Sequence, residues 1–224
     1  MFANNHNPEF NTARRAAALT QELKPPARFE GVTARVFPLK ANMARLRAFC
    51  DAYLNMDIPK TLVHFQPALP YVYLAALNYG KMSAEVANLG WVSQHEIAFL
   101  VPLERSREEN GRLVFQDWAT VAPFIFVDDD WSLATGREVY GWPKVKAWLT
   151  PETNRWMTTP LAEEDLLTLS TMVFPEVYEG QRQQPRILME IDHSPSLSFS
   201  QLPPDLLSLT NPLAGILPAI SSSL

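Results

Sequence analysis

Short strand-like runs dominate the sequence from residue 61 onward. Each run is rich in β-branched and aromatic residues and is bounded by proline or by polar residues. The runs cover 61–65, 71–77, 95–103, 113–115, 121–127, 166–174 and 186–191, and an earlier one covers 31–40. Two segments, 12–23 and 42–55, have the apolar spacing of a helix instead. This pattern predicts a mainly β (α+β) fold, with an antiparallel sheet or barrel and a few flanking helices.

The size and composition of the chain predict a single domain over residues 1–224. The chain has 224 residues, and its hydrophobic fraction of 47% is enough for a sizeable core. We expect residues 1–29 to form an N-terminal arm that contains the first helix. Residues 193–224 are rich in Ser, Pro and Leu and have no strand or helix pattern. We expect a loosely structured C-terminal segment there, as in a chain whose continuation is missing.

Charge and cysteine content exclude several classes of partner. The net charge of −5 and the lack of a basic run argue against binding to nucleic acid or to an anionic membrane. No stretch reaches transmembrane length, and the polar N-terminus lacks the apolar core of a secretory signal. The single cysteine, Cys50, permits no internal disulfide. It falls on the apolar stripe of the helix predicted over 42–55, so we interpret it as a core residue in a cytoplasmic protein.

Cofactor and metal motifs are missing from the sequence. There is no phosphate-binding loop, no GxGxxG turn and no GxSxG elbow. No set of histidines and cysteines has zinc spacing. The run Asp128-Asp129-Asp130 invites a metal hypothesis, but carboxylate ligands converge from different elements or from alternate loop positions. A solvated turn is the preferred interpretation, and we expect neither a metal nor an organic cofactor.

One lysine lies in an unusual stretch of the chain. Lys144 follows Pro143, which fixes the backbone before it. Large or apolar residues surround it in the sequence: Trp142, Val145, Ala147 and Trp148. Loss of hydration disfavours the charged form of an amine, and a neutral amine can attack a carbonyl. The alternative is a lysine that extends from an apolar patch to water, and composition alone favours that alternative.

Glu96 lies in the run 95–103, where both faces of the predicted strand are apolar. Alternation places Ile97 on one face and groups Glu96 with Ala98 on the other. A strand covered on both faces would bury the Glu96 carboxylate, which is costly for a charged group. A glutamate exposed at the strand end is the alternative, and the pattern favours neither.

The stretch around Lys144 resembles a signature of the acetoacetate decarboxylase family. Its Gly-Arg-Glu element at 136–138 is followed by Gly-x-Pro-Lys at 141–144. Other elements occur in the order that bacterial acetoacetate decarboxylase-like proteins show: Phe65-x-Pro67-x-x-Pro70, Tyr79-Gly80-x-Met82, Gln94-x-Glu96 and the run from Phe124 to Asp129. The resemblance covers roughly residues 30 to 190.

The resemblance implies a fold and a reaction. The fold would be an antiparallel cone-like β-barrel with a central apolar cavity, assembled into large homo-oligomers. Lys144 would form a Schiff base with a small keto acid, and Glu96 would supply or shuttle a proton. The implied activity is decarboxylation of a β-keto acid such as acetoacetate through the imine on Lys144.

The resemblance also implies a set of substrate-binding residues. Arg137 and Glu138 match the Gly-Arg-Glu element, where we expect an ion pair or a wall of the pocket. Trp142 would line the pocket beside the lysine. Tyr73 stands where the family has a second acidic residue on the strand that enters the cavity.

The sequence departs from the family pattern at two further places. The second family lysine, directly after the first, is a valine here, which leaves Lys146 or Arg137 to supply a neighbouring positive charge. Val32 aligns with the arginine that meets the substrate carboxylate in the family, and Arg28 or Arg35 could substitute for it. The chain also ends earlier than is usual for the family.

These departures leave two alternative functions open beside decarboxylation. The same lysine could support an aldolase or dehydratase that acts on an α-keto acid, because imine formation does not depend on the missing arginine. A non-catalytic barrel that binds a small ligand is the third hypothesis. Release of carbon dioxide separates the first from the second.

Overall fold

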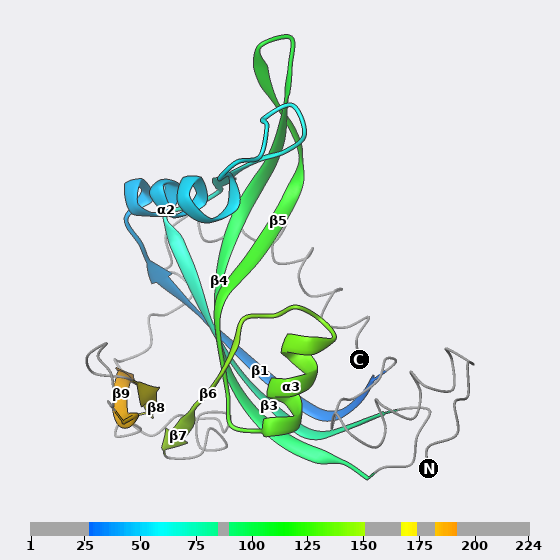
Figure 1. Ribbon diagram of the computed structural model, residues 1–224, viewed down its shortest axis with the longest axis vertical. Helices are drawn as coiled ribbons and strands as arrows, with labels where there is room; N and C mark the ends of the chain where they lie inside the picture. Colours follow the sequence, from blue (N-terminus) through cyan, green and yellow to red (C-terminus); the bar gives the residue numbers. More distant parts are fainter. Residues whose placement is uncertain (1–26, 85–89, 151–166, 174–181, 192–224) are drawn as a thin grey trace, which may run out of the picture. The chain divides into compact units, whose positions relative to one another are not determined.

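The computed structural model describes residues 27–84, 90–150, 167–173 and 182–191 (Figure 1). The helix predicted over 12–23 and the segment 193–224 lie outside these residues. The described residues fall into two compact units. Unit 1 contains 27–34, 77–84, 90–96, 125–150, 167–173 and 182–191, and unit 2 contains 35–76 and 97–124. Four strands contribute residues to both units, and the single domain stays a prediction.

Strands make up most of the described residues. The elements are β1 (Ala27–Lys40), α2 (Met43–Phe49), the π-helix η1 (Cys50–Leu54), β2 (His64–Pro67), β3 (Tyr71–Ala84), β4 (Val92–Glu109), β5 (Arg112–Val127), α3 (Asp130–Glu138), β6 (Lys144–Lys146), β7 (Trp148–Thr150), β8 (Leu167–Val173) and β9 (Gln184–Ile191). The mainly β prediction is confirmed, with two short α-helices in the described residues. Strand β1 begins at Ala27, so the end of the predicted N-terminal arm is strand.

The strands form two sheets in the described part of the chain. One has the order β1-β3-β4-β5-β6, with β2 paired to β4, and the other has the order β7-β8-β9. One pairing differs from the antiparallel expectation, because β6 runs parallel to β5 with Lys144 opposite Ile125. A parallel pair needs a crossover connection, and α3 is that connection. Closure of the strands into a barrel stays a prediction.

The connection between β4 and β5 is shorter than the sequence suggests. The charged run 104–112 predicts a hairpin loop, but β4 continues to Glu109 and β5 starts at Arg112. Asn110 and Gly111 have φ angles of 52° and 75°. Two residues with positive φ make a tight hairpin turn whose twist matches the flanking strands. The charges of the run therefore lie on strand residues rather than in a loop.

Unit 2 is built on the helix predicted over 42–55, which the structure divides into α2 and η1. The side chain of Asn42 caps α2 by accepting hydrogen bonds from two main-chain N–H groups of the first turn. Leu46 and Cys50 are buried against Val101 and Leu103 of β4. The core position predicted for Cys50 is confirmed. Burial, followed by the charge of Asp51, raises the pKa of the Cys50 thiol to about 11.

Membrane-spanning helices were not expected from the sequence. Within the described ranges, neither α-helix has the length and apolar character needed to cross a bilayer.

Candidate active site

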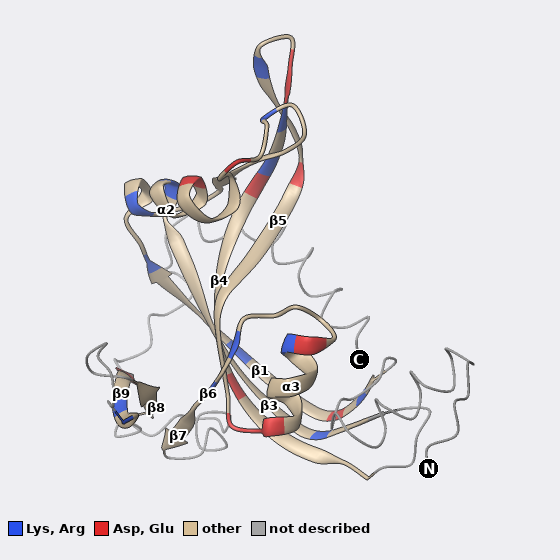
Figure 2. Ribbon diagram, viewed as in Figure 1, with Lys and Arg blue, Asp and Glu red and all other residues tan. Residues whose placement is uncertain are grey.

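Helix α3 and strand β6, both in unit 1, position the predicted nucleophile. The Oδ1 atom of Asp129 accepts a hydrogen bond of 2.7 Å from the main-chain N–H of Ser132, and this contact caps the helix. Charged residues lie at both ends of α3, with Asp130 in the first turn and Arg137 in the last (Figure 2). Asp130 and Arg137 each complement the nearer end of the helix dipole, whereas Glu138 at the C-terminal end opposes it. Ser132 and Gly136 are one helical turn apart, so they share a face of α3.

Lys144 and Glu96 form a buried ion pair. The Nζ atom of Lys144 lies 3.1 Å from Oε2 of Glu96. It also donates a hydrogen bond of 2.7 Å to Oγ of Ser132. Lys144 is 7% exposed, Glu96 3% and Ser132 4%. The structure thus joins the two predicted catalytic residues and adds a hydroxyl that the sequence interpretation did not include.

The burial of Glu96 decides between the two interpretations of its strand. Its neighbours Ile97 and Ala98 are buried as well, so both faces of β4 are covered at this position. Gln94 lies on the same face as Glu96, and its Nε2 donates a hydrogen bond of 2.8 Å to Glu96 Oε2. Two donors therefore converge on one carboxylate oxygen, which stabilises its negative charge.

Tyr79 of β3 lies within electrostatic range of the Glu96 carboxylate. Burial and, next, the Glu96 carboxylate raise the pKa of Tyr79 well above its ordinary value. The phenol therefore keeps its proton. Tyr79 packs with Phe29, Met82 and Trp131 in an apolar cluster of unit 1. A neutral phenol therefore lies within electrostatic range of the Glu96 carboxylate.

The aliphatic part of the Lys144 side chain passes directly over Gly136. A β-carbon added at residue 136 would lie 2.7 Å from Cε of Lys144 and closer still to Cδ. No real β-carbon is that close to another carbon, so the lysine would have to move. Glycine inside a helix is unfavourable by about 1 kcal/mol relative to alanine. Space for the lysine is the physical reason for a glycine at this position.

Most sequence neighbours of Lys144 do not bury it. Val145 and Trp148 are exposed, and only Ala147 is fully buried. Trp142 is half-exposed, and its ring centroid lies 5.6 Å from the Lys144 amine. The apolar surroundings predicted from the stretch 142–148 are therefore wrong in detail. Alternation along β6 turns Val145 away from Lys144, and α3 and β4 bury the lysine instead.

Of the two charged residues in the Gly-Arg-Glu element, Arg137 holds the main chain of β6 and Glu138 lies at the surface. The guanidinium of Arg137 donates a hydrogen bond of 3.1 Å to the carbonyl oxygen of Lys144. Glu138 is exposed. Lys146, a suggested source of positive charge, pairs with Asp130 at 2.8 Å and donates to the carbonyl of Asp128 at 2.6 Å. Its amine is thus held by the acidic turn.

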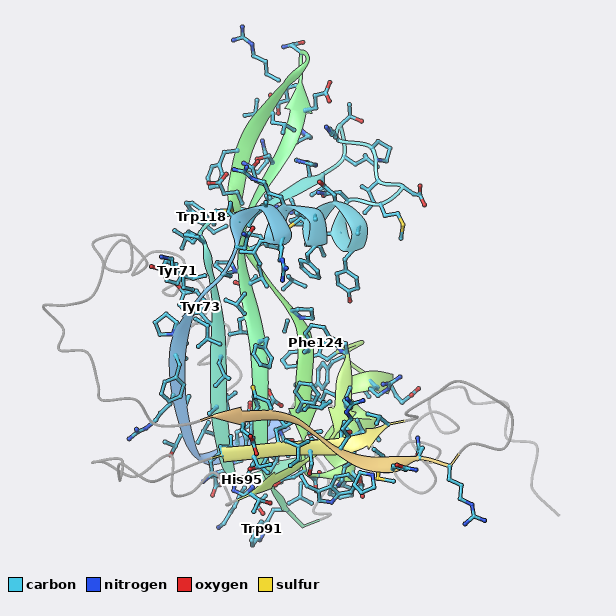
Figure 3. The ribbon with its side chains drawn as sticks, turned by 90° about the vertical axis from the view of Figure 1, so that its left-hand side faces the viewer. Tyr71, Tyr73, Trp91, His95, Trp118 and Phe124 are labelled. Atoms are coloured by element: carbon cyan, nitrogen blue, oxygen red, sulfur yellow. The ribbon has the colours of Figure 1, made fainter. Side chains whose placement is uncertain are left out.

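Tyr73 and Arg28 complete the set of residues predicted to bind substrate. Tyr73 is buried in unit 2, where it clusters with Tyr71 on β3 and with Leu69 and Leu100 (Figure 3). A role for Tyr73 in substrate binding stays a prediction. Arg28, a suggested replacement for the missing arginine, is exposed and pairs with Glu30 at 3.0 Å.

Each residue of the acidic run has a structural partner. Asp128 accepts hydrogen bonds from the main-chain N–H of His95 at 2.7 Å and contacts its ring Nδ1 at 2.6 Å (His95 in Figure 3). Asp129 caps α3, and Asp130 pairs with Lys146. Among the residues that the structure describes, no group of three or more His, Cys, Asp or Glu side chains could hold a metal ion. The run is therefore a capped turn in which the carboxylates have separate tasks.

Sequence reasoning missed three polar or conformational features of the site. Ser132, Gly136 and Gln94 all lie within contact of Lys144 or Glu96. Two spacings could have indicated them. Ser132 and Gly136 stand four residues apart on a predictable helix face, and Gln94 alternates with Glu96 on one strand face.

Known proteins resemble this chain in structure but not at the level of a family or sequence match. No family model matches the sequence, and no curated protein matches it. A solved structure that the chain resembles is that of acetoacetate decarboxylase from Legionella pneumophila subsp. pneumophila str. Philadelphia 1, with a TM-score of 0.39 and 19% sequence identity. The match covers 65% of this chain and 44% of that chain, which is less than half of that protein's length.

Proposed function

We propose that this chain is a Schiff-base-forming lyase that decarboxylates a β-keto acid such as acetoacetate through an imine on Lys144. The observation that carries the proposal is the buried contact of 3.1 Å between the Lys144 amine and the Glu96 carboxylate. A buried lysine beside a proton acceptor can become a nucleophile. The Gly-Arg-Glu and Gly-x-Pro-Lys elements noted in the sequence support the same reaction.

The ion pair supplies the first step. Transfer of one proton from Nζ of Lys144 to Oε2 of Glu96 leaves a neutral amine and a neutral acid. The amine can then attack the ketone carbon, while the acid keeps the proton that later steps need.

The imine then acts as an electron sink. The ketone oxygen leaves as water, and the protonated imine accepts the electron pair from the bond to the carboxylate as carbon dioxide departs. Glu96 gives its first proton to the departing oxygen and takes a second one from bulk water, and its carboxyl is the proposed donor of the proton that the enamine carbon then takes. Water finally releases the ketone and restores the Lys144 amine.

The remaining residues take supporting roles in this proposal. Arg137 positions Lys144 through the main-chain hydrogen bond described above. Glu138 and Trp142 would border the entrance of the pocket, since Glu138 is exposed and the half-exposed Trp142 lies beside the lysine amine. Tyr73 would contact substrate if the strands close into the cone-like barrel. We also propose a cytoplasmic homo-oligomer that needs no metal or cofactor and binds neither nucleic acid nor membranes.

One observation favours an aldolase or dehydratase acting on an α-keto acid as the second candidate. Val32 stands at the position of the family arginine, and Arg28 pairs with Glu30 at 3.0 Å. A reaction that does not expel a carboxylate has less need of a cation at that place. The imine on Lys144 would be common to both reactions.

Borohydride trapping tests the proposal. Borohydride added with acetoacetate should leave a reduced adduct on Lys144, located by peptide mass spectrometry. Lys144→Met should abolish the adduct, whereas Lys40→Met, at an exposed lysine of β1, should retain it. Release of carbon dioxide supports decarboxylation, and an adduct without it supports the second candidate. The proposal is wrong if no keto acid in a panel labels Lys144.

A further inference from the structure

Gln94 has one half of its side-chain amide bound and the other half free. It is 1% exposed, and its Nε2 donates to Oε2 of Glu96 at 2.8 Å. Its Oε1 is sealed from solvent and has no hydrogen-bond partner within the described residues. Rotating the amide by half a turn would place this oxygen against the Glu96 carboxylate. Two acceptors would then face each other, so the free group is the carbonyl.

The buried side-chain carbonyl of Gln94 has no hydrogen-bond partner among the described residues, and this needs a physical reason. Burying an acceptor without a partner is destabilising, and most buried polar groups in proteins are paired. A catalytic role, in which a bound molecule supplies the missing donor, is one of the recognised explanations for such a group. Gln94 shares the Oε2 atom of Glu96 with the amine of Lys144. The free acceptor therefore belongs to the same hydrogen-bonded group as the proposed nucleophile.

We propose that Oε1 of Gln94 accepts a hydrogen bond from the hydroxyl of the carbinolamine that forms on Lys144, which makes Gln94 a catalytic residue. This proposal rests on the imine chemistry of Lys144 proposed above. The neutral amine adds to the carbonyl carbon, a C–N bond forms, and the π electron pair moves to oxygen. That oxygen takes a proton from the attacking nitrogen and becomes the hydroxyl.

The hydroxyl then leaves as water. The Glu96 carboxyl gives it a proton, the C–O bond breaks, and the nitrogen lone pair forms the C=N bond of the protonated imine. Glu96 returns to the carboxylate and faces the positive charge of the imine. No oxidant or reductant takes part. Gln94, which is bound to Glu96, holds the leaving hydroxyl beside its proton donor.

The contact discriminates between the bound ketone and the carbinolamine. A ketone oxygen has no hydrogen to donate and would repel Oε1 of Gln94, whereas the carbinolamine hydroxyl can donate. An interaction that exists only after the addition lowers the barrier without strengthening substrate binding. Loss of Gln94 should therefore reduce kcat and leave KM nearly unchanged.

Timed borohydride quenching of a reaction with acetoacetate tests this inference. Gln94→Met keeps the approximate size of the side chain and removes both amide groups. We expect the rate of adduct formation on Lys144 at saturating acetoacetate to fall by about tenfold to a hundredfold. The final adduct yield should be retained after long incubation, and KM should change by less than about twofold.

A second glutamine provides the matched control. Gln66 of β2 donates to Oε2 of Glu104 at 2.6 Å, which is the same kind of amide-to-carboxylate contact within unit 2. Gln66→Met should leave both the rate and KM unchanged. Thermal unfolding of the two variants separates a catalytic effect from a structural one, because a catalytic role predicts similar melting temperatures for both.

Several results would overturn the inference. An unchanged rate in folded Gln94→Met means that a buried water or nothing at all satisfies Oε1. A raised KM with unchanged kcat means that Gln94 only binds the ground state. If Gln94→Met does not fold, Gln94→Asn, which withdraws the carbonyl by one methylene, must slow trapping in the same way. A native chain that gives no adduct overturns the proposed function as well, whereas native trapping with an unaffected variant overturns this inference alone.

Discussion

The side chain of Lys144 occupies the space in which a β-carbon of residue 136 would lie. Helix α3 therefore has glycine at this position instead of alanine, the better helix former, and the missing β-carbon leaves space for the Lys144 side chain. The relationship links a local cost in helix stability to the placement of the proposed nucleophile.

Gly136→Ala should separate stability from activity. The new methyl group must push the Lys144 stem away from α3, so we expect trapping by borohydride to fall by about tenfold or more, as when a catalytic group is misplaced by about an ångström. The gain in helix propensity, about 1 kcal/mol, should offset much of the packing cost. Urea unfolding and trapping on the same preparations measure both quantities. Full trapping activity in this variant would mean that the position of the lysine stem does not matter.

The ion pair between Lys144 and Glu96 should be sensitive to the loss of either partner alone. Lys144→Met leaves a buried carboxylate without its cation, and we expect the free energy of unfolding to fall by about 3–5 kcal/mol. The double variant Lys144→Met with Glu96→Gln removes both charges and should recover a large part of that loss. Chemical denaturation of both single variants and the double variant completes the cycle. Additive losses would show that the two groups do not interact.

The raised pKa of Cys50 predicts a pH dependence of stability in alkali. Its folded pKa of about 11 lies above the ordinary value of 9.0, so the folded state favours the neutral thiol. The stabilisation is present below pH 9.0 and is lost as pH rises toward 11. Cys50→Ala should reduce the slope of unfolding free energy against pH in this window. A thiol reagent at pH 8 should label native Cys50 far more slowly than the unfolded chain, and rapid native labelling would contradict its burial.

Asp129 is the cap of α3, and burial raises the pKa of its carboxyl above the ordinary 3.8 despite the hydrogen bond from Ser132. Asp129→Ala should lower the free energy of unfolding by about 0.5–2 kcal/mol because the cap is lost. Asp129→Asn keeps an accepting oxygen and should be at least as stable as the native chain at pH 7. Because the folded pKa is raised, native stability falls as pH rises from 3.8 through the folded pKa, so the advantage of the asparagine variant should grow in that window. Equal losses for both variants would mean that charge, rather than the cap, stabilises the helix.

Much of the local structure could be predicted from the sequence. Alternation and helical spacing indicated most strands, the helix over 42–55 and the core position of Cys50, because side-chain periodicity follows directly from backbone geometry. The Asn110-Gly111 pair indicated a hairpin turn. The predicted length of the hairpin loop was wrong, because solvent-facing charged residues on a strand have the same sequence pattern as a loop.

The candidate site could be predicted only in part. Lys144 and Glu96 were found from motif and strand pattern, and the structure brings them together. Ser132, Gly136 and Gln94 were missed as site residues, because their importance comes from contacts with Lys144 and Glu96 rather than from their own neighbours. The prediction that Val145 and Trp148 help to shield Lys144 was wrong, since both are exposed and Val145, adjacent on the strand, points to the opposite face.

The sequence by itself determined that the chain is mainly β, that one lysine follows a proline in an unusual stretch, and that a glutamate lies on a strand with apolar faces. Only the tertiary structure decided that these two residues meet. The parallel pairing of β6 with β5 requires a crossover, and the crossover helix α3 lays Ser132 and Gly136 against Lys144. Burial of a charged amine depends on elements far away in the chain, because strand neighbours cannot shield a side chain that points away from them.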